Sequence, residues 1–174
     1  MLMNRGYVHV YTGDGKGKTT AALGLALRAA GAGKKVFIAQ FVKSIEYSEW
    51  KALKSLQNSI DITLYGHGCF IAKNPEQEDI SAARKGLQDI HRILMSKKYD
   101  LIILDEITIA LYYRLLSLED VITLLKDKPY ETELVLTGRY APEAIIEFAD
   151  LVTEMKEIKH YYQQGVLSRE GIDR

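Results

Sequence analysis

A glycine-rich turn between an apolar strand and an alanine-rich helix constrains the fold of this chain more than any other feature. The stretch reads YVHVYTGDGKGKTTAALGLALRAAG over residues 7–31. Such a turn points successive backbone N–H groups inward, where they can bind phosphate oxygens, and the helix adds the positive end of its dipole. Gly17-Lys18-Thr19 ends the nucleotide-binding pattern G-x-x-x-x-G-K-[ST]. The stretch predicts a phosphate-binding loop.

The first glycine of that pattern is replaced by Thr12. The turn depends most on its internal glycines, and we expect Gly13 and Gly15 to supply the positive φ that it needs. A glycine-rich turn without a ligand is the alternative, against which the three glycines, the lysine and two threonines all argue. The predicted nucleotide-binding residues here are Thr12, Gly13, Asp14, Gly15, Lys16, Gly17, Lys18, Thr19 and Thr20.

Short β-rich runs alternate with helical patterns along the rest of the chain. This alternation is typical of parallel strands joined by crossover helices. The predicted strands are Tyr7–Tyr11, Val36–Val42, Asp61–Tyr65, Leu101–Asp105, Leu134–Thr137 and, more weakly, Leu151–Met155. The predicted helices are Thr19–Ala30, 79–95, Leu118–Lys126 and Pro142–Phe148. We therefore expect one domain over residues 1–174, an α/β three-layer P-loop (RecA-like) fold with a mostly parallel sheet of five or six strands and helices on both faces.

Composition excludes several classes of function. The 174 residues carry 23 basic and 23 acidic side chains, so no broad positive field favours nucleic acid. A single cysteine excludes an internal disulfide and a cysteine-rich zinc site. The N-terminus lacks the pattern of a signal peptide, and no apolar run reaches ~20 residues. We expect a cytoplasmic protein that binds neither nucleic acid nor membranes.

An acidic pair and two arginines complete the predicted nucleotide site. The stretch LIILDE places Asp105 and Glu106 after a continuous apolar run, which is typical of a strand buried on both faces. Carboxylates at that end can hold Mg²⁺, directly or through water, although a solvated helix cap is the commoner use of such a pair. Arg139, in LTGR, follows another strand, and Arg28 lies on the helix after the loop. Either can stabilise a polyphosphate, and a plain surface role is the alternative for each.

Several motifs together resemble one family, the ATP:corrinoid adenosyltransferases with a nucleotide-binding P-loop. The motifs are YTGDGKGKTTAALGLALRAAGAGKKV, LDEIT, LTGR and the tail ADLVTEMKEIKHYYQQGVLSREGID, and the likeness covers roughly residues 6–173. The family also has no glycine at the position of Thr12. The resemblance implies that reduced Co(I) attacks the 5′ carbon of ATP and that triphosphate leaves, giving adenosylcobalamin or its precursor from cob(I)yrinic acid a,c-diamide or cob(I)alamin. The corrinoid brings its own nucleophile, so no general base is needed.

The resemblance also assigns roles to residues. Lys18, Glu106 and Arg139 become the catalytic residues, while Thr19 and Glu106 bind Mg²⁺ with Asp105 beside it. Arg28 and Arg139 correspond to the arginines near the nucleotide in the family. The tail from about residue 157 is expected to be a loop packing near the active site.

Two departures from the family concern the corrinoid. A segment G-x-G-F-x-W, whose aromatics displace the lower cobalt ligand in relatives, reads GHGCFIA here, so Phe70 lies one place off. Phe70, His67 and Trp50 are the predicted corrinoid-side residues. A loop side chain packed on the core is the alternative for Phe70, and ordinary partial burial is the alternative for Trp50. Only about five residues precede the first strand, where many relatives carry a helical extension.

The expected partners are ATP, a corrinoid, an electron-donating reductase or flavoprotein, and a second copy in a homodimer. Two other function classes remain open on the residues alone. A P-loop kinase or ATPase of other specificity would produce ADP. A non-catalytic RecA-like assembly module would show nucleotide-dependent oligomers without turnover.

Overall fold

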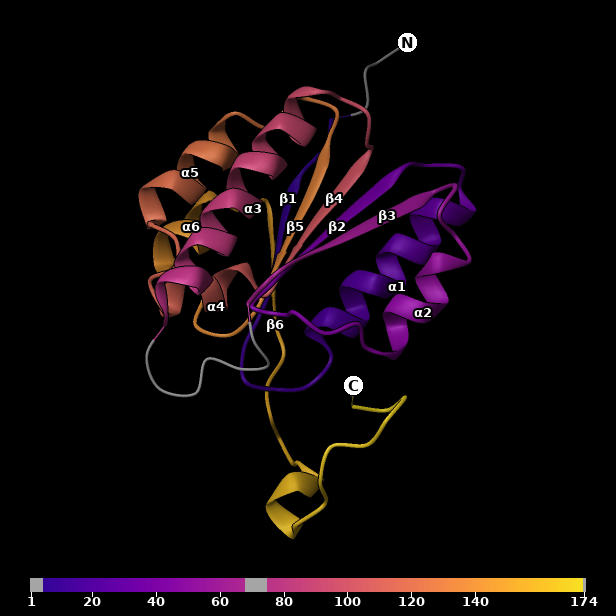
Figure 1. Cartoon of the computed structure of the whole chain (residues 1–174), viewed down its shortest axis with the longest axis vertical. Helices are drawn as coiled ribbons and strands as arrows, with labels where there is room; N and C mark the ends of the chain where they lie inside the picture. The colour runs from indigo at the N-terminus through magenta and orange to yellow at the C-terminus, as the bar shows by residue number, and fades with distance from the viewer. Residues whose placement is uncertain (1–4, 68–74, 174) are drawn as a thin grey trace.

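The computed structural model describes residues 5–67 and 75–173, which form one parallel sheet covered by helices on both faces (Figure 1). The strand order is β3-β2-β4-β5-β1-β6, and every neighbouring pair is parallel. The strands are β1 Val8–Thr12, β2 Val36–Phe41, β3 Ile60–Tyr65, β4 Leu101–Asp105, β5 Glu133–Thr137 and β6 Leu151–Glu154. The predicted fold class is confirmed.

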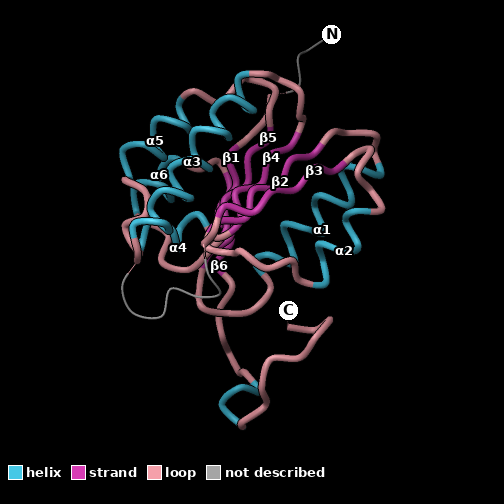
Figure 2. The backbone as a smooth tube through the Cα atoms, in the orientation of Figure 1, coloured by secondary structure: helices cyan, strands magenta, loops and turns pink. Residues whose placement is uncertain are grey.

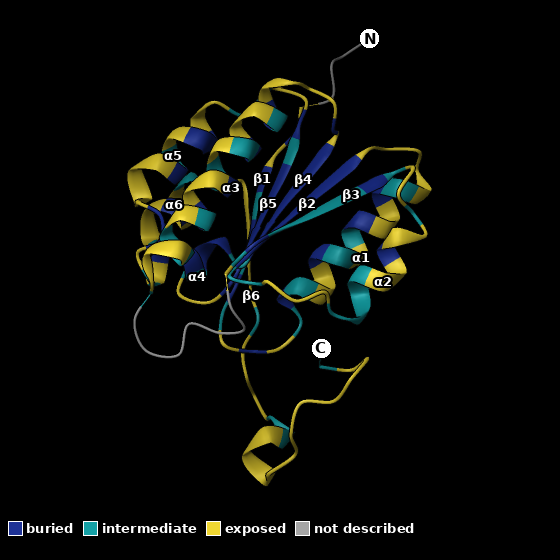
Figure 3. Ribbon diagram, in the orientation of Figure 1, coloured by how far each residue is buried: buried dark blue, intermediate teal, exposed yellow. Residues whose placement is uncertain are grey.

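Helices pack on the two faces of the sheet as separate layers (Figure 2). One face carries α1 Lys18–Gly31 and α2 Ser48–Lys54, and the other carries α3 Gln77–Met95, α4 Ile107–Tyr112, α5 Leu118–Lys126 and α6 Glu143–Phe148. Each layer has its own apolar core, because β2 and β4 are buried along their whole length and present side chains to both faces. Figure 3 shows the buried strands between the half-exposed helices.

Two short helices were absent from the predicted elements, α2 and α4. Helix α4 buries Ile107, Thr108, Ala110 and Leu111, so it lacks the single apolar stripe that marks a surface helix. Pro142 was predicted in the first turn of its helix, but it is the N-cap of α6 and the first helical residue is Glu143. None of the helices in the described ranges combines the length and apolarity needed to cross a membrane.

The carboxyl ends of the strands meet at one edge of the sheet, which is the lower edge in Figure 1. The glycine-rich turn leaves the end of β1 there, and Asp105 ends β4. Strand β5 lies between these two strands, so its last residue, Thr137, separates the turn from the carboxylate. The C-terminal tail also leaves the sheet at this edge, after β6, and includes the 3₁₀ helix η1 Tyr161–Gln164.

Candidate active site

The phosphate loop begins at the end of β1 and closes onto α1. Gly13 and Gly17 have φ of 94° and 119°, in the left-handed region that glycine adopts readily. The prediction that Gly15 supplies positive φ was wrong, because Gly15 is not among the positive-φ glycines. It needs to be glycine for another reason, since a Cβ there would lie 2.8 Å from the backbone of Lys156.

Lys18 lies inside this loop and is buried. Its ammonium donates to the carbonyl oxygens of Gly13 (2.6 Å) and Gly15 (2.7 Å). Burial and the neighbouring charge of Arg139 lower the pKa of Lys18, while Glu106 opposes that shift. The loop therefore already holds a positive charge at its centre, with a second cation beside it.

Asp105 organises the centre of the site. Its carboxylate is 1% exposed, and all four of the acceptor positions that a carboxylate offers are used. Oδ1 accepts from the hydroxyls of Thr19 (2.8 Å) and Thr137 (2.6 Å). Oδ2 accepts from Gln40 Nε2 (3.0 Å) and Lys43 Nζ (2.8 Å). Burial alone would raise the pKa of Asp105, but Lys43 and the hydroxyl donors outweigh it and hold the pKa below its ordinary value.

Glu106 adopts a left-handed backbone conformation, with φ of 60°, just before α4. Its N–H donates to the Thr137 hydroxyl (3.0 Å), which holds the residue in this unfavourable geometry. Burial and the negative charge of Asp105 raise the pKa of Glu106, while Lys43, Lys18 and Arg139 oppose the shift. A mostly buried carboxylate facing several cations suits an electrostatic role at this edge of the sheet.

Arg139 reaches the loop from the end of β5. Its Nη2 donates to the carbonyl oxygen of Asp14 (3.1 Å), and its own carbonyl accepts from the Thr108 hydroxyl (2.7 Å). Gly138 has φ of 135°, and a Cβ there would lie 2.2 Å from the Thr108 hydroxyl. The tight turn thus places the guanidinium against the phosphate loop.

Thr19 and Glu106 carry oxygen groups that could hold a magnesium ion at this edge of the sheet, whereas the oxygens of Asp105 are occupied by hydrogen bonds. A hydroxyl and a carboxylate are oxygen ligands of the kind that Mg²⁺ prefers. Asp105 has no acceptor position left, because its oxygens already receive four hydrogen bonds. The described residues contain no cluster of three or more His, Cys, Asp or Glu side chains that would form a metal site by itself.

The structure does not bring every predicted residue to the loop. Arg28 lies in the last turn of α1, ten residues beyond Lys18 and hence about 15 Å along the helix. There its charge opposes the rise in the pKa of Tyr11 that burial causes. His67 is exposed after β3, and Phe70 lies outside the described residues. Trp50 packs in α2 with the Lys54 ammonium 4.6 Å from its ring centroid, and its indole Nε1 is buried without a partner.

Three of the four residues that donate to Asp105 were not predicted from the sequence, namely Gln40, Lys43 and Thr137. Gln40 and Lys43 supply two of the four donors to Asp105. One signal was available, since Gln40 is a polar residue inside the otherwise apolar strand VFIAQF. Lys43 shows no such signal, because a lysine after a strand is usually a solvated loop residue.

Residues 4–173 match the model of a protein family described as ATP:corrinoid adenosyltransferase BtuR/CobO/CobP. The corrinoid adenosyltransferase of Escherichia coli K12 is 36% identical over 169 residues, which cover 97% of this chain and 86% of the relative. The corresponding CobA protein of Salmonella typhimurium is 35% identical with the same coverage. The corrinoid adenosyltransferase of a Sinorhizobium species is 34% identical over 172 residues, 97% of this chain and 80% of the relative.

A solved structure supports the fold alone. The flagellar accessory protein FlaH of Methanocaldococcus jannaschii superposes with a TM-score of 0.62 at 12% identity. The superposition covers 87% of this chain and 72% of FlaH.

Proposed function

The chain belongs to the ATP:corrinoid adenosyltransferase family, and on that premise we propose that it transfers the 5′-deoxyadenosyl group of ATP to the Co(I) of a reduced corrinoid. The C5′–O bond of ATP breaks and its electron pair leaves with triphosphate. The Co–C bond forms from two electrons of cobalt, so the protein supplies no nucleophile. One observation carries the proposal: the phosphate loop closes around Lys18 with Arg139 against its rim, an arrangement that grips a departing polyphosphate.

The chain's own residues act mainly on the leaving group. Lys18 and Arg139 lower the energy of the negative charge that develops on triphosphate as the C5′–O bond breaks. Both cations already contact the loop, which would keep reorganisation small at the moment of reaction. Arg28 is proposed as a nucleotide contact from the family resemblance alone.

We assign Mg²⁺ to Thr19 and Glu106, where it would add charge neutralisation on the phosphates. Asp105 acts behind them, since its carboxylate accepts a hydrogen bond from the Thr19 hydroxyl and its charge is neutralised by Lys43. It thereby orients the threonine and holds Lys43 at the edge of the site. Asp105 is a positioning residue in this proposal.

The corrinoid side of the reaction rests on the resemblance. We propose that Phe70, His67 and Trp50 contact the corrinoid, that a reductase or flavoprotein supplies the electron, and that the active form is a cytoplasmic homodimer. A complete cobalamin and a biosynthetic precursor are both candidate substrates.

The test mixes the protein with MgATP and chemically reduced cobalamin and follows the visible spectrum. We expect a light-sensitive adenosylated product and one triphosphate for each corrinoid. The Lys18→Ala variant should turn over about 10²–10³-fold more slowly, because the leaving group loses its central charge. Formation of ADP and phosphate without a corrinoid product would instead favour a P-loop kinase or ATPase.

A further inference from the structure

The C-terminal tail forms part of the wall of the phosphate loop. Met155 donates its N–H to the Thr12 carbonyl (2.8 Å), and its carbonyl accepts from Gly15 N–H (2.7 Å). A Cβ on Gly13 would lie 2.5 Å from the same Met155 carbonyl. The tail backbone thus lies directly against the loop, and one of the loop's N–H groups is committed to it.

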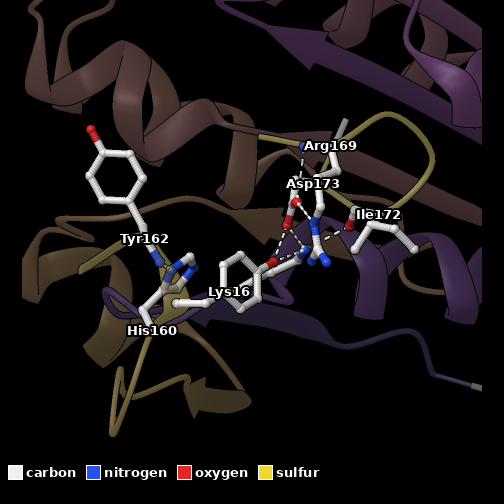
Figure 4. A network of polar contacts seen from close by, with 7 residues as sticks. Lys16, His160, Tyr162, Arg169, Ile172 and Asp173 are labelled. Atoms are coloured by element: carbon white, nitrogen blue, oxygen red, sulfur yellow. Dashed lines mark hydrogen bonds and ion pairs between the residues drawn. The ribbon is translucent and has the colours of Figure 1, made fainter. Parts of the chain in front are cut away.

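The tail then turns outward through η1 and returns to the loop at Lys16 (Figures 1 and 4). The Lys16 ammonium donates to the Tyr161 hydroxyl (3.1 Å), the Ile172 carbonyl (2.6 Å) and the Asp173 carboxylate. An ammonium has three protons. All three are therefore used by the tail.

Asp173 is the centre of this contact. Its Oδ1 accepts from Lys16 and from the Tyr161 hydroxyl, and its Oδ2 accepts from the backbone N–H and Nε of Arg169, both at 3.0 Å. The Arg169 guanidinium also lies 4.6 Å from the Tyr161 ring centroid. The Asp173 side chain is 12% exposed, in a segment that is otherwise largely exposed. We call Lys16, Tyr161, Arg169 and Asp173 the tail clasp.

We propose that Lys16 anchors the C-terminal tail over the phosphate loop through Asp173, and that its ammonium affects triphosphate binding through the tail and not by contact with phosphate. The ammonium has no proton left to donate while the clasp is closed. A direct contact with phosphate would have to break at least one of its bonds to a carboxylate, a carbonyl or a hydroxyl. Lys18, by contrast, already lies inside the loop. The consequence for triphosphate rests on the proposed function; the anchoring of the tail does not.

The first measurement is hydrogen exchange of the tail amides in the full chain without nucleotide. Lys16→Met and Asp173→Asn should each speed exchange over residues 161–173 by about tenfold, because each removes the charge-assisted bond that closes the clasp. The double variant should exchange no faster than either single variant. Glu170→Gln is the matched control, since it removes a carboxylate three residues away that lies outside the clasp. An unchanged exchange rate in Asp173→Asn overturns the anchoring.

The second measurement is the affinity for inorganic triphosphate with Mg²⁺, by calorimetry. Lys16→Met and Asp173→Asn should weaken binding by similar factors, and the double variant should be no weaker than either. Lys18→Ala should weaken binding without changing tail exchange. If Lys16→Met weakens binding while Asp173→Asn leaves it unchanged or tightens it, or if the two effects add, Lys16 is a phosphate ligand and the proposal fails.

These two measurements use neither a corrinoid nor turnover. A failure of the clasp would leave the transferase assay of the unsubstituted protein positive. A chain without transferase activity would still show the coupling between Lys16 and Asp173 in hydrogen exchange. The two proposals can therefore fail separately.

Discussion

Replacing Lys43 by methionine tests whether the Lys43 ammonium neutralises the negative charge of the buried Asp105 carboxylate. The two side chains form an ion pair at 2.8 Å, with Lys43 18% and Asp105 1% exposed. Methionine keeps most of the unbranched stem and removes the charge. Asp105 keeps its hydrogen bonds from Thr19, Thr137 and Gln40 but loses its cation.

The expected loss of unfolding free energy follows from leaving a buried charge without its counter-ion. Removing one partner of a buried ion pair costs about 3–5 kcal/mol, and the three remaining donors place the expected loss of unfolding free energy near the lower value, about 3 kcal/mol at pH 7. For a domain of this size such a loss lowers Tm by about 6–12 °C.

The pH dependence distinguishes this mechanism from lost packing. In the unsubstituted protein the pKa of Asp105 is lowered, so its contribution to stability is present above the ordinary aspartate pKa and is lost as pH falls through the lower, folded value. Without Lys43, burial dominates and raises the pKa of Asp105. The variant then takes up a proton on Asp105 when pH falls from 7 towards 4.5. The stability difference between the two proteins should shrink by more than about 1 kcal/mol over that range, since one pKa unit corresponds to about 1.4 kcal/mol.

The assay is urea unfolding of both proteins at pH 7 and at pH 4.5, with a chelator present to exclude divalent metal. Lys54→Met, which removes an exposed lysine paired with Glu46, is the matched control and should change stability by less than about 1 kcal/mol at either pH. A loss for Lys43→Met that is equal at both pH values would refute the unpaired-charge reasoning.

Two further predictions concern the same edge of the sheet. Gly138→Ala should lower the free energy of unfolding in urea by about 1–3 kcal/mol, because φ at this position is 135° and the new Cβ would meet the Thr108 hydroxyl. The control is Gly24→Ala, in the open middle of α1, which should stabilise the protein by up to about 1 kcal/mol. Equal effects of the two substitutions would contradict the steric argument. Because the pKa of Glu106 is raised, Mg²⁺-dependent triphosphate binding should weaken as pH falls, starting at a higher pH than for an ordinary glutamate. Calorimetry from pH 7.5 to 5 checks this, and a Glu106→Gln variant that keeps the same pH profile would exclude Glu106 as the titrating group.

Much of the fold could be predicted because its signals are local. Strand Leu101–Asp105 and helix Leu118–Lys126 have the predicted bounds, since a continuous apolar run and an amphipathic period each occur within ten residues. Helix α4 was missed because it is buried on several sides and shows no period. The phosphate loop was visible for the same reason as the strands, because strand, glycines, lysine and helix are contiguous.

The sequence by itself determined the fold class, the family and the position of the loop, the acidic pair and Arg139 at the carboxyl ends of the strands. The fold class and these positions need only short-range patterns and the rule that parallel strands end at one edge. The family follows from the resemblance of the quoted motifs. Tertiary structure alone decided that Lys43 neutralises the charge of Asp105, that Gly15 faces the tail and that Asp173 pairs with Lys16. Each of these contacts joins residues that lie far apart in the sequence. The last joins residues 157 positions apart, a separation over which no local pattern carries information.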